Sequence, residues 1–345
     1  MNSVKMKQIS LGGLSLLLGL SLSAPCRADD YHPGQGLRAG NFLVSGYANV
    51  VAESPRGSPA QLSIDDLSLF VSGRVNRWLN PFLETEVSSA TLLQSGDAPI
   101  DRGHFVMERF YDDIGLSAED TLRVGKILAP VGDWNLIHAA PLVPTTTRPL
   151  TTQRGFSEYA NGLSWLRDPG PGAGPDWQIY WQPGREWLPK PGSIAPEHFR
   201  NVFGAHLNWS SGLSDQLGIS FQQGRSGSAD ERYRLIGFNV RRSIGQLALE
   251  SEATRTLWSG SAPRVHDRES GIYALADYAF TARWHGILEA EHYLSRHSLD
   301  PSKNTLAGLA YKPQSSLVWK LEYVHQTGDA REIPTGWLAS FSVLF

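Results

Sequence analysis

Cysteine and long apolar runs are both scarce in this chain of 345 residues, and each scarcity excludes a class of protein. Cys26 is the only cysteine, so the chain beyond it has no disulfides, thiolate metal sites or cysteine nucleophiles. The apolar run from Ile9 to Leu22 is shorter than the roughly 20 residues that a membrane-spanning helix requires, and no later segment reaches that length. Residence in an inner membrane is therefore not expected.

The first 28 residues have the three parts of a secretory signal peptide. Lys5 and Lys7 precede the apolar run, and small residues end it before cleavage, which we expect after Ala28. Residues 29–40 would then form a short periplasmic segment. A lipid-modified Cys26 is the less favoured alternative, because Pro25 stands where lipoprotein signals have a small residue.

The charge balance is acidic once this leader is set aside. Removal of the leader lowers the basic count from 31 to 28 against 34 acidic residues. This balance disfavours nucleic acid as a partner. No linker or change in composition divides the rest, so we expect one domain over residues 41–345.

Sixteen segments of alternating apolar and polar residues lie between turn signals, a pattern typical of a transmembrane barrel. In the last of them Trp337, Ala339, Phe341, Val343 and Phe345 share one face. We therefore predict an all-β fold, an antiparallel transmembrane β-barrel of about 16 strands; a soluble β-sandwich or jelly roll is the alternative. The segments are Leu43–Ala52, Leu67–Val75, Phe82–Thr91, Phe105–Leu116, Thr121–Ile127, Gly162–Leu166, Trp177–Gln182, Asn201–Trp209, Gln216–Gln223, Arg234–Arg241, Gln246–Thr254, Gly271–Phe280, Trp284–Leu294, Thr305–Lys312, Leu317–Gln326 and Gly336–Phe345.

The connections are mostly tight after even-numbered segments and long after odd-numbered ones. This asymmetry is typical of bacterial outer-membrane barrels, so we expect both termini in the periplasm and the long loops outside a Gram-negative cell. The fourth segment breaks the alternation at Glu108, Phe110 and Asp112, which predicts a β-bulge there or an error in its bounds.

In each segment, the positions that alternate with the apolar residues are mostly charged or polar. A barrel of this size leaves room for water, so we expect these side chains to line an aqueous lumen, or to pair with their neighbours there. Acids concentrate between the eleventh and fifteenth segments, and they would favour cations only if that wall controls the narrowest point. The candidate lumen residues are Arg74, Glu84, Glu86, Arg123, His206, Arg241, Glu250, Glu252, Asp277, Glu289, Glu291, Lys320 and Glu322.

The stretch from Ala129 to Tyr159 is too long and too polar for a tight turn, and its four prolines exclude a central strand. Unstructured loops of this length are usually functional or disordered, and this one has apolar residues that could fix it to a wall. We expect residues 132–158 to fold into the barrel as a constriction loop. Its candidate site residues are Asp133, His138, Arg148, Arg154 and Glu158, where the arginines could contact anions or hold the loop to the wall.

The leader, the sixteen segments, the long inward segment and the terminal Phe345 together resemble the Gram-negative porins. The run from Leu122 to Trp134 (LRVGKILAPVGDW) is also similar to strands of the phosphate-selective porin O and P group. The resemblance implies an outer-membrane homotrimer in membrane lipid, assembled through recognition of Phe345. It also implies passive diffusion of small hydrophilic solutes, with no cofactor.

Two other functions remain open on the sequence. An outer-membrane enzyme of the phospholipase or protease kind is disfavoured because no G-x-S-x-G motif is present, and no histidine spacing indicates a metal. We therefore expect no enzymatic activity. A barrel with a closed lumen that serves in adhesion or envelope assembly is the second alternative.

Overall fold

A computed structural model of the chain describes residues 33–96, 100–170, 172–191, 197–211, 215–226, 231–329, 333 and 335–345. The expected signal peptide, with Cys26, lies outside the described residues. Seventeen strands and one short 3-10 helix, η2 (Leu150–Thr152), make up the described secondary structure. The strands are β1 (Leu37–Ala39), β2 (Phe42–Pro55), β3 (Gln61–Gly73), β4 (Pro81–Gln94), β5 (Arg102–Gly115), β6 (Asp120–Leu128), β7 (Tyr159–Arg167), β8 (Asp176–Arg185), β9 (Phe199–Ser211), β10 (Asp215–Ser226), β11 (Arg232–Ile244), β12 (Leu247–Ser259), β13 (Arg268–Ala279), β14 (Trp284–Leu294), β15 (Ser302–Gln314), β16 (Leu317–Thr327) and β17 (Gly336–Leu344).

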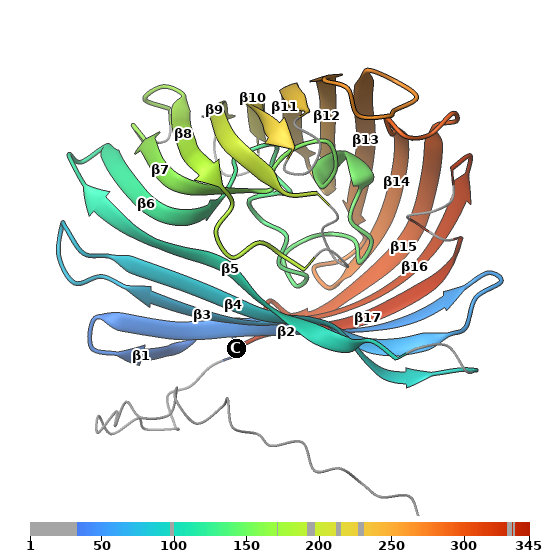
Figure 1. The fold of residues 1–345 in the computed structure, drawn as a ribbon. Helices are drawn as coiled ribbons and strands as arrows, with labels where there is room; N and C mark the ends of the chain where they lie inside the picture. Colours follow the sequence, from blue (N-terminus) through green and yellow to red (C-terminus); the bar gives the residue numbers. More distant parts are fainter. Residues whose placement is uncertain are drawn as a thin grey trace, which may run out of the picture. The chain divides into compact units, whose positions relative to one another are not determined.

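Strands β2 to β17 form one closed antiparallel barrel of sixteen strands (Figure 1). Each pairs with its neighbours in the sequence, and β17 pairs with β2 to close the ring. The predicted fold class and strand number are confirmed, and each predicted segment overlaps one strand of the ring. Strand β1 was not predicted: it pairs with the start of β2 from Leu37 to Ala39, within the segment 29–40 that we expected to be periplasmic.

The two faces of the barrel differ as the alternation predicts. Exposed positions on the outside are apolar, while the neighbours between them point inward and are polar and buried, such as Ser68, Ser220 and Lys320. Outer side chains that are more than a third exposed include Leu67, Leu69, Leu217, Phe221, Trp319 and Leu321. No helix in the described part of the chain is long and apolar enough to cross a membrane.

The last residue of the sequence, Phe345, hydrogen-bonds to β2. The Phe345 amide donates to the carbonyl of Gly46, and the Gly46 amide donates to the carbonyl of Phe345, both at 2.9 Å. A side chain on Gly46 would collide with the Phe345 ring, because a Cβ atom there would lie 2.7 Å from it. Gly46 therefore makes room for the terminal aromatic residue.

Bulges interrupt the alternation in the wall formed by β3, β4 and β5. On β3, Asp66 pairs with Asn49 while Ile64 pairs with Val50, so Asp65 is an extra residue. On β5, Arg109 pairs with Glu84 while Met107 pairs with Thr85, so Glu108 is extra. The irregularity predicted for the fourth segment is thus a bulge at Glu108.

The wall is also discontinuous between β5 and β6. Strand β5 pairs with β4 from Arg102 to Asp112, but in the described residues it pairs with β6 only from Phe110 to Gly115. We call the uncovered edge of β5, residues 102–109, the seam. An open strand edge is unfavourable at membrane depth unless other parts of the protein cover it.

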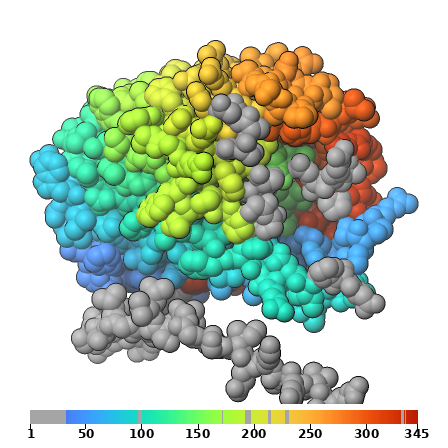
Figure 2. Space-filling view, viewed as in Figure 1, coloured from blue at the N-terminus to red at the C-terminus, as the bar shows by residue number. Residues whose placement is uncertain are grey.

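Residues Glu186 to Lys190, which follow β8, contact β5 and β6 where the seam ends, and we call them the strap. The Lys190 ammonium lies 2.9 Å from a Glu108 carboxylate oxygen, and the Lys126 ammonium donates to the Leu188 carbonyl at 2.7 Å. The ring of Trp187 packs 6.2 Å from that of Phe110. In Figure 2 the yellow-green atoms that follow β8 lie directly against the green-cyan atoms of β5.

Candidate functional site

The segment between β6 and β7, residues 129–158, makes hydrogen bonds to inward-facing residues of the barrel wall. Its two ends are joined by a hydrogen bond of 2.8 Å from the Ala129 amide to the Glu158 carbonyl. The buried Asn135 side-chain amide donates to both of these residues' carbonyls, at 2.7 and 2.9 Å. The segment is therefore a closed loop with a fixed neck, and we call it the inner segment.

Three wall glutamates bind backbone N–H groups of the inner segment, and each comes from a different strand. Glu252 on β12 accepts from the amides of Asp133 and Trp134, at 2.9 and 3.0 Å. Glu291 on β14 accepts from the amide and hydroxyl of Thr151, both at 2.8 Å. Each carboxyl group satisfies backbone N–H groups that would otherwise be unpaired inside the barrel, so these acids are anchors of the segment.

Glu322 and Lys320, both on β16, complete this attachment. Glu322 accepts from the amides of Thr146 and Thr147. The Lys320 ammonium donates to the carbonyls of Ala140 and Thr145, at 2.8 and 3.0 Å. The inner segment therefore covers the acid-rich wall that the sequence predicts. The side chains that anchor the segment are buried beneath it.

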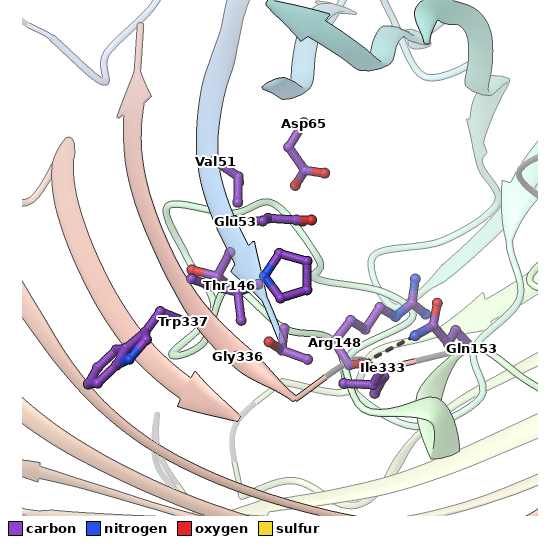
Figure 3. A pocket seen from close by; sticks show the side chains of 12 residues that line it. Val51, Glu53, Asp65, Thr146, Arg148, Gln153, Ile333, Gly336 and Trp337 are labelled. Atoms are coloured by element: carbon purple, nitrogen blue, oxygen red, sulfur yellow. Dashed lines mark hydrogen bonds between the residues drawn. The ribbon is translucent and has the colours of Figure 1, made fainter. Parts of the chain in front are cut away.

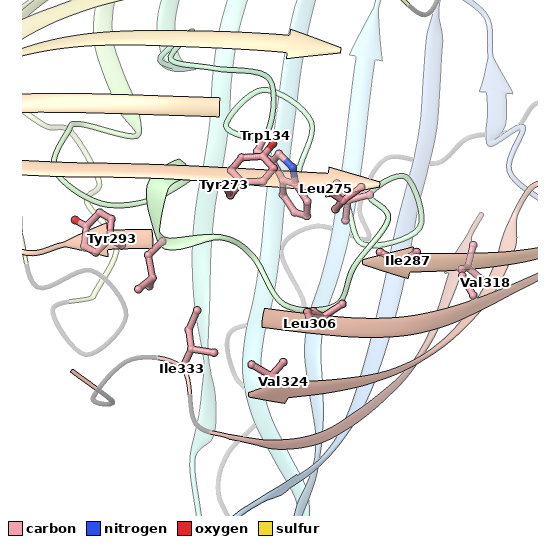
Figure 4. Packing of buried hydrophobic residues seen from close by; sticks show 12 residues of the cluster. Trp134, Tyr273, Leu275, Ile287, Tyr293, Leu306, Val318, Val324 and Ile333 are labelled. Carbon is pink, nitrogen blue, oxygen red and sulfur yellow. The ribbon is translucent and has the colours of Figure 1, made fainter. Parts of the chain in front are cut away.

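Apolar packing fixes the same face of the segment. Trp134, Val143 and Leu150 of the inner segment join a buried cluster with inward-facing side chains of β13 to β16 (Figure 4). A second cluster places Val131 and Phe156 against inward-facing side chains of β8 to β12, including Tyr180, Leu235 and Trp258. The segment thus lies against the wall from β8 to β16.

The charged residues of the inner segment bond mainly within the protein. The Arg148 guanidinium lies 3.1 Å from Glu158 and donates to Asn135 and Thr152. Asp133 accepts from the side-chain amides of Gln216 and Asn239; burial raises the pKa of Asp133, and nearby Arg241 opposes this. Arg148 is therefore a clamp within the segment and Asp133 a contact to the wall.

His138 and Arg154 complete the predicted set on this segment. The Nδ1 atom of His138 is sealed from solvent without a hydrogen-bond partner in the described structure. Burial, together with the Arg148 guanidinium, lowers the pKa of His138 to about 3. The Arg154 amide donates to the Leu150 carbonyl at 3.0 Å, which continues the turn of η2.

A cavity of about 340 Å³ lies on the other side of the inner segment, against β2, β3 and β17 (Figure 3). We call it the hollow. Glu53 and Asp65 line it from the wall, and Thr146, Arg148 and Gln153 line it from the inner segment. The sequence prediction included Arg148 but missed Glu53, Asp65 and Gln153. Glu53 and Asp65 lie just outside the predicted first and second segments, because both strands extend further than the alternation indicates.

The remaining predicted wall charges form pairs on the inner face. Arg123 makes two bonds to Asp113, at 2.6 and 2.8 Å, and Arg241 lies 2.8 Å from Glu250. Other contacts join Glu84 to Arg109, Glu86 to Ser68, Asp277 to His285, and His206 to Ser220. The structure gives no hydrogen bond for Glu289, whose Oε2 atom is buried. Arg74 lies one residue beyond the end of β3, exposed at the end of the barrel with the short turns, beside Arg38 and Asn41.

A second group of charges joins the strap to the inner wall. Lys190 and the hydroxyl of Tyr159 both contact Glu108, the extra residue of the β5 bulge. Burial opposes the charge on Lys190, but the carboxylates of Glu108 and Glu158 outweigh it and raise the pKa of Lys190. Burial also raises the pKa of Glu186 to about 7, against the opposing effect of Lys126. Sequence reasoning did not single out Lys190, because the charges it meets come from strands far away in the chain.

The described residues contain no group of three or more His, Cys, Asp or Glu side chains placed to hold a metal ion.

Known proteins resemble this chain in structure and not in sequence. No family model and no curated protein matches the sequence. The anion-selective porin from Comamonas acidovorans has a TM-score of 0.61 at 12% identity, over 88% of this chain and 98% of that one. The outer membrane channel DcaP of Acinetobacter baumannii has a TM-score of 0.60 at 12% identity, over 91% of this chain and 100% of that one.

A third similar structure is in-vitro folded OmpT, an outer membrane protein of Vibrio cholerae, in its trimer form. Its TM-score is 0.61 at 10% identity, over 88% of this chain and 99% of that one. At such identities the likeness concerns the path of the backbone, which agrees over nearly the whole length of all three proteins. The chain therefore has the barrel fold found in porins and other outer-membrane channels.

Proposed function

We propose that this protein is an outer-membrane porin, a water-filled channel for passive diffusion of small hydrophilic solutes and ions. The observation that carries the proposal is the polar hollow between the inner segment and the wall of β2, β3 and β17, inside a closed barrel. A barrel of sixteen strands is wide enough to leave an aqueous channel. The exposed apolar outer face fits a barrel in contact with lipid.

In this proposal residues 132–158 form the constriction. Their anchors on β12, β14 and β16 and their two apolar clusters hold them to one side of the lumen, so solutes would pass on the other side, along the hollow. The predicted lumen charges would line or support this path. Their pairing with one another keeps the inner face polar without requiring each of them to contact a solute.

We also propose that the protein is a homotrimer in the outer membrane of a Gram-negative cell and that the barrel assembly machinery recognises Phe345. The trimer form of the similar Vibrio cholerae protein supports the first part. The position of Phe345, which follows β17 and hydrogen-bonds to Gly46 of β2, supports the second.

Single-channel recording tests the proposal directly. The mature protein would be folded in detergent and added to a planar lipid bilayer at fixed voltage, with heat-denatured protein as the control. We expect stable conductance steps from the folded protein only. Folded protein that gives no steps would contradict the channel and favour a closed barrel, to be tested next for lipid hydrolysis and for binding through the outer loops.

A further inference from the structure

We propose that the channel prefers small cations and that Glu53 and Asp65 determine this preference. The inference rests on the proposed channel function and goes further, because it names the class of solute and the residues that select it. It concerns the charge along the path of diffusion and requires no bound ion. The argument compares the charges that face the hollow.

The hollow has two acids and one base among its lining residues. Glu53 on β2 and Asp65 on β3 extend from the wall, and Arg148 faces them from the inner segment (Figure 3). By formal charge alone the lining would be nearly balanced. The result therefore depends on which of these charges are compensated by their own neighbours.

Arg148 is compensated. Its guanidinium lies 3.1 Å from the Glu158 carboxylate and also donates to the Asn135 side chain, to the Thr152 carbonyl at 2.6 Å and to the Thr152 hydroxyl. A guanidinium has five N–H donors, so these bonds leave it little capacity to bind a passing anion. The pair formed with Glu158 has no net charge.

Glu53 and Asp65 are not compensated in this way. The Gln61 side chain donates to Glu53 at 3.0 Å, and the Asn49 side chain donates to Asp65 at 2.9 Å. Both donors are neutral amides, which orient a carboxylate without cancelling its charge. Asp65 reaches the lumen because it is the extra residue of the β3 bulge. Glu252, Glu291 and Glu322, by contrast, are bonded to the inner segment.

Lys320, Arg38 and Arg74 do not reverse this balance. Lys320 donates to carbonyls of the inner segment, and its charge acts more strongly on Glu322 than on Asp65. Arg38 and Arg74 are exposed at the end with the short turns, where salt screens them. Screening acts over about 10 Å at 0.1 M salt, so an ion inside a cavity of about 340 Å³ remains within reach of both uncompensated carboxylates.

The test is the reversal potential of the full mature protein in a planar bilayer across a potassium chloride gradient. We expect a permeability ratio of potassium to chloride above one for the wild type. Glu53→Gln and Asp65→Asn should each lower the ratio, and the double variant should lower it by about threefold or more at 0.1 M salt. The single variants guard against a double variant that folds poorly.

The matched control is Asp300→Asn, which removes the same charge from an exposed position in the loop after β14 and should leave the ratio unchanged. The inference would be wrong if the wild type prefers chloride, or if the double variant conducts with the same permeability ratio as the wild type. Neither result would contradict the proposed channel function. Folded wild-type protein without any conductance would contradict the proposed function itself and the selectivity with it.

Discussion

At the scale of single residues, two inserted acids explain why the inner wall differs from a simple alternation. Asp65 and Glu108 are each the extra residue of a β-bulge. The regular alternation of inward and outward side chains therefore does not predict which way they point. One lines the hollow and the other meets Lys190 of the strap. The chemistry of this wall therefore depends on residues that a regular strand would not accommodate.

His138 makes folding stability depend on pH. Its pKa is about 3 in the folded protein, below the ordinary value of about 6.5, because it is buried near Arg148, Arg109 and Lys190, with Glu108 in partial opposition. The unfolded chain binds the proton more readily, so stability is complete above about pH 6.5 and falls as the pH drops toward 3. We expect the wild type to lose about 1 to 2 kcal/mol between pH 7.5 and 5 through this residue.

His138→Gln should remove that part of the dependence. The measurement is urea unfolding of the detergent-folded protein at the two pH values, with wild type and variant compared at each. Other groups also titrate in this range, so the difference between the two proteins is the relevant quantity. If both lose the same stability on acidification, His138 has no such effect.

At the scale of elements, the inner segment is fixed by acids from alternate strands. Glu252, Glu291 and Glu322 lie on β12, β14 and β16, and each binds backbone N–H groups that a loop inside a barrel would otherwise leave unpaired. The wall thus supplies the hydrogen bonds that a strand partner gives elsewhere. The segment needs no regular structure of its own beyond η2.

Removal of an anchor should loosen the inner segment while the barrel remains. We expect Glu291→Ala and Glu322→Ala each to lower the free energy of unfolding by roughly 1.5 to 3 kcal/mol, since each loses hydrogen bonds to a charged group. Single-channel records should show more current noise. Glu291→Gln and Glu322→Gln keep an acceptor oxygen and should recover most of the loss.

Glu289→Ala is the control for these variants, because Glu289 lies on β14 two residues from Glu291 and has no hydrogen bond to the inner segment. It should cost less stability than Glu291→Ala and leave the current noise unchanged. Equal losses in both variants would mean that removal of any buried carboxylate, and not release of the segment, explains the effect.

The sequence predicts the strands well and the contacts between distant parts poorly. Alternation and turn residues are local signals, so all sixteen strands of the ring were found; only β1, three residues long, was missed. The roles of Glu252, Glu291 and Glu322 could not be read in this way, because their partners are more than 100 residues away in the chain. Glu53 and Asp65 were not predicted to face the lumen. Glu53 lies near the end of its strand, and Asp65 lies at the β3 bulge, so alternation does not show which face of the barrel they are on.

At the scale of the whole molecule, the connections fall into two groups at opposite ends of the strands. Two residues join β11 to β12 and β15 to β16, whereas thirty join β6 to β7. If the short turns face the periplasm, Asp300→Cys in the loop after β14 should react with an impermeant maleimide added to intact cells, and Ser315→Cys should not. The chain beyond Cys26 has no other cysteine to give background.

Both labelling positions are exposed, so access to the reagent and not burial decides the result. Lysed cells are the control, in which both variants should react. Labelling of Ser315→Cys, and not of Asp300→Cys, on intact cells would reverse the orientation of the barrel.

The strap also imposes an order of events on assembly. The seam is an edge of β5, but the strap residues that contact its end follow β8, more than 70 positions later in the chain. The contact between Lys190 and Glu108 can therefore form only after β8 has been placed.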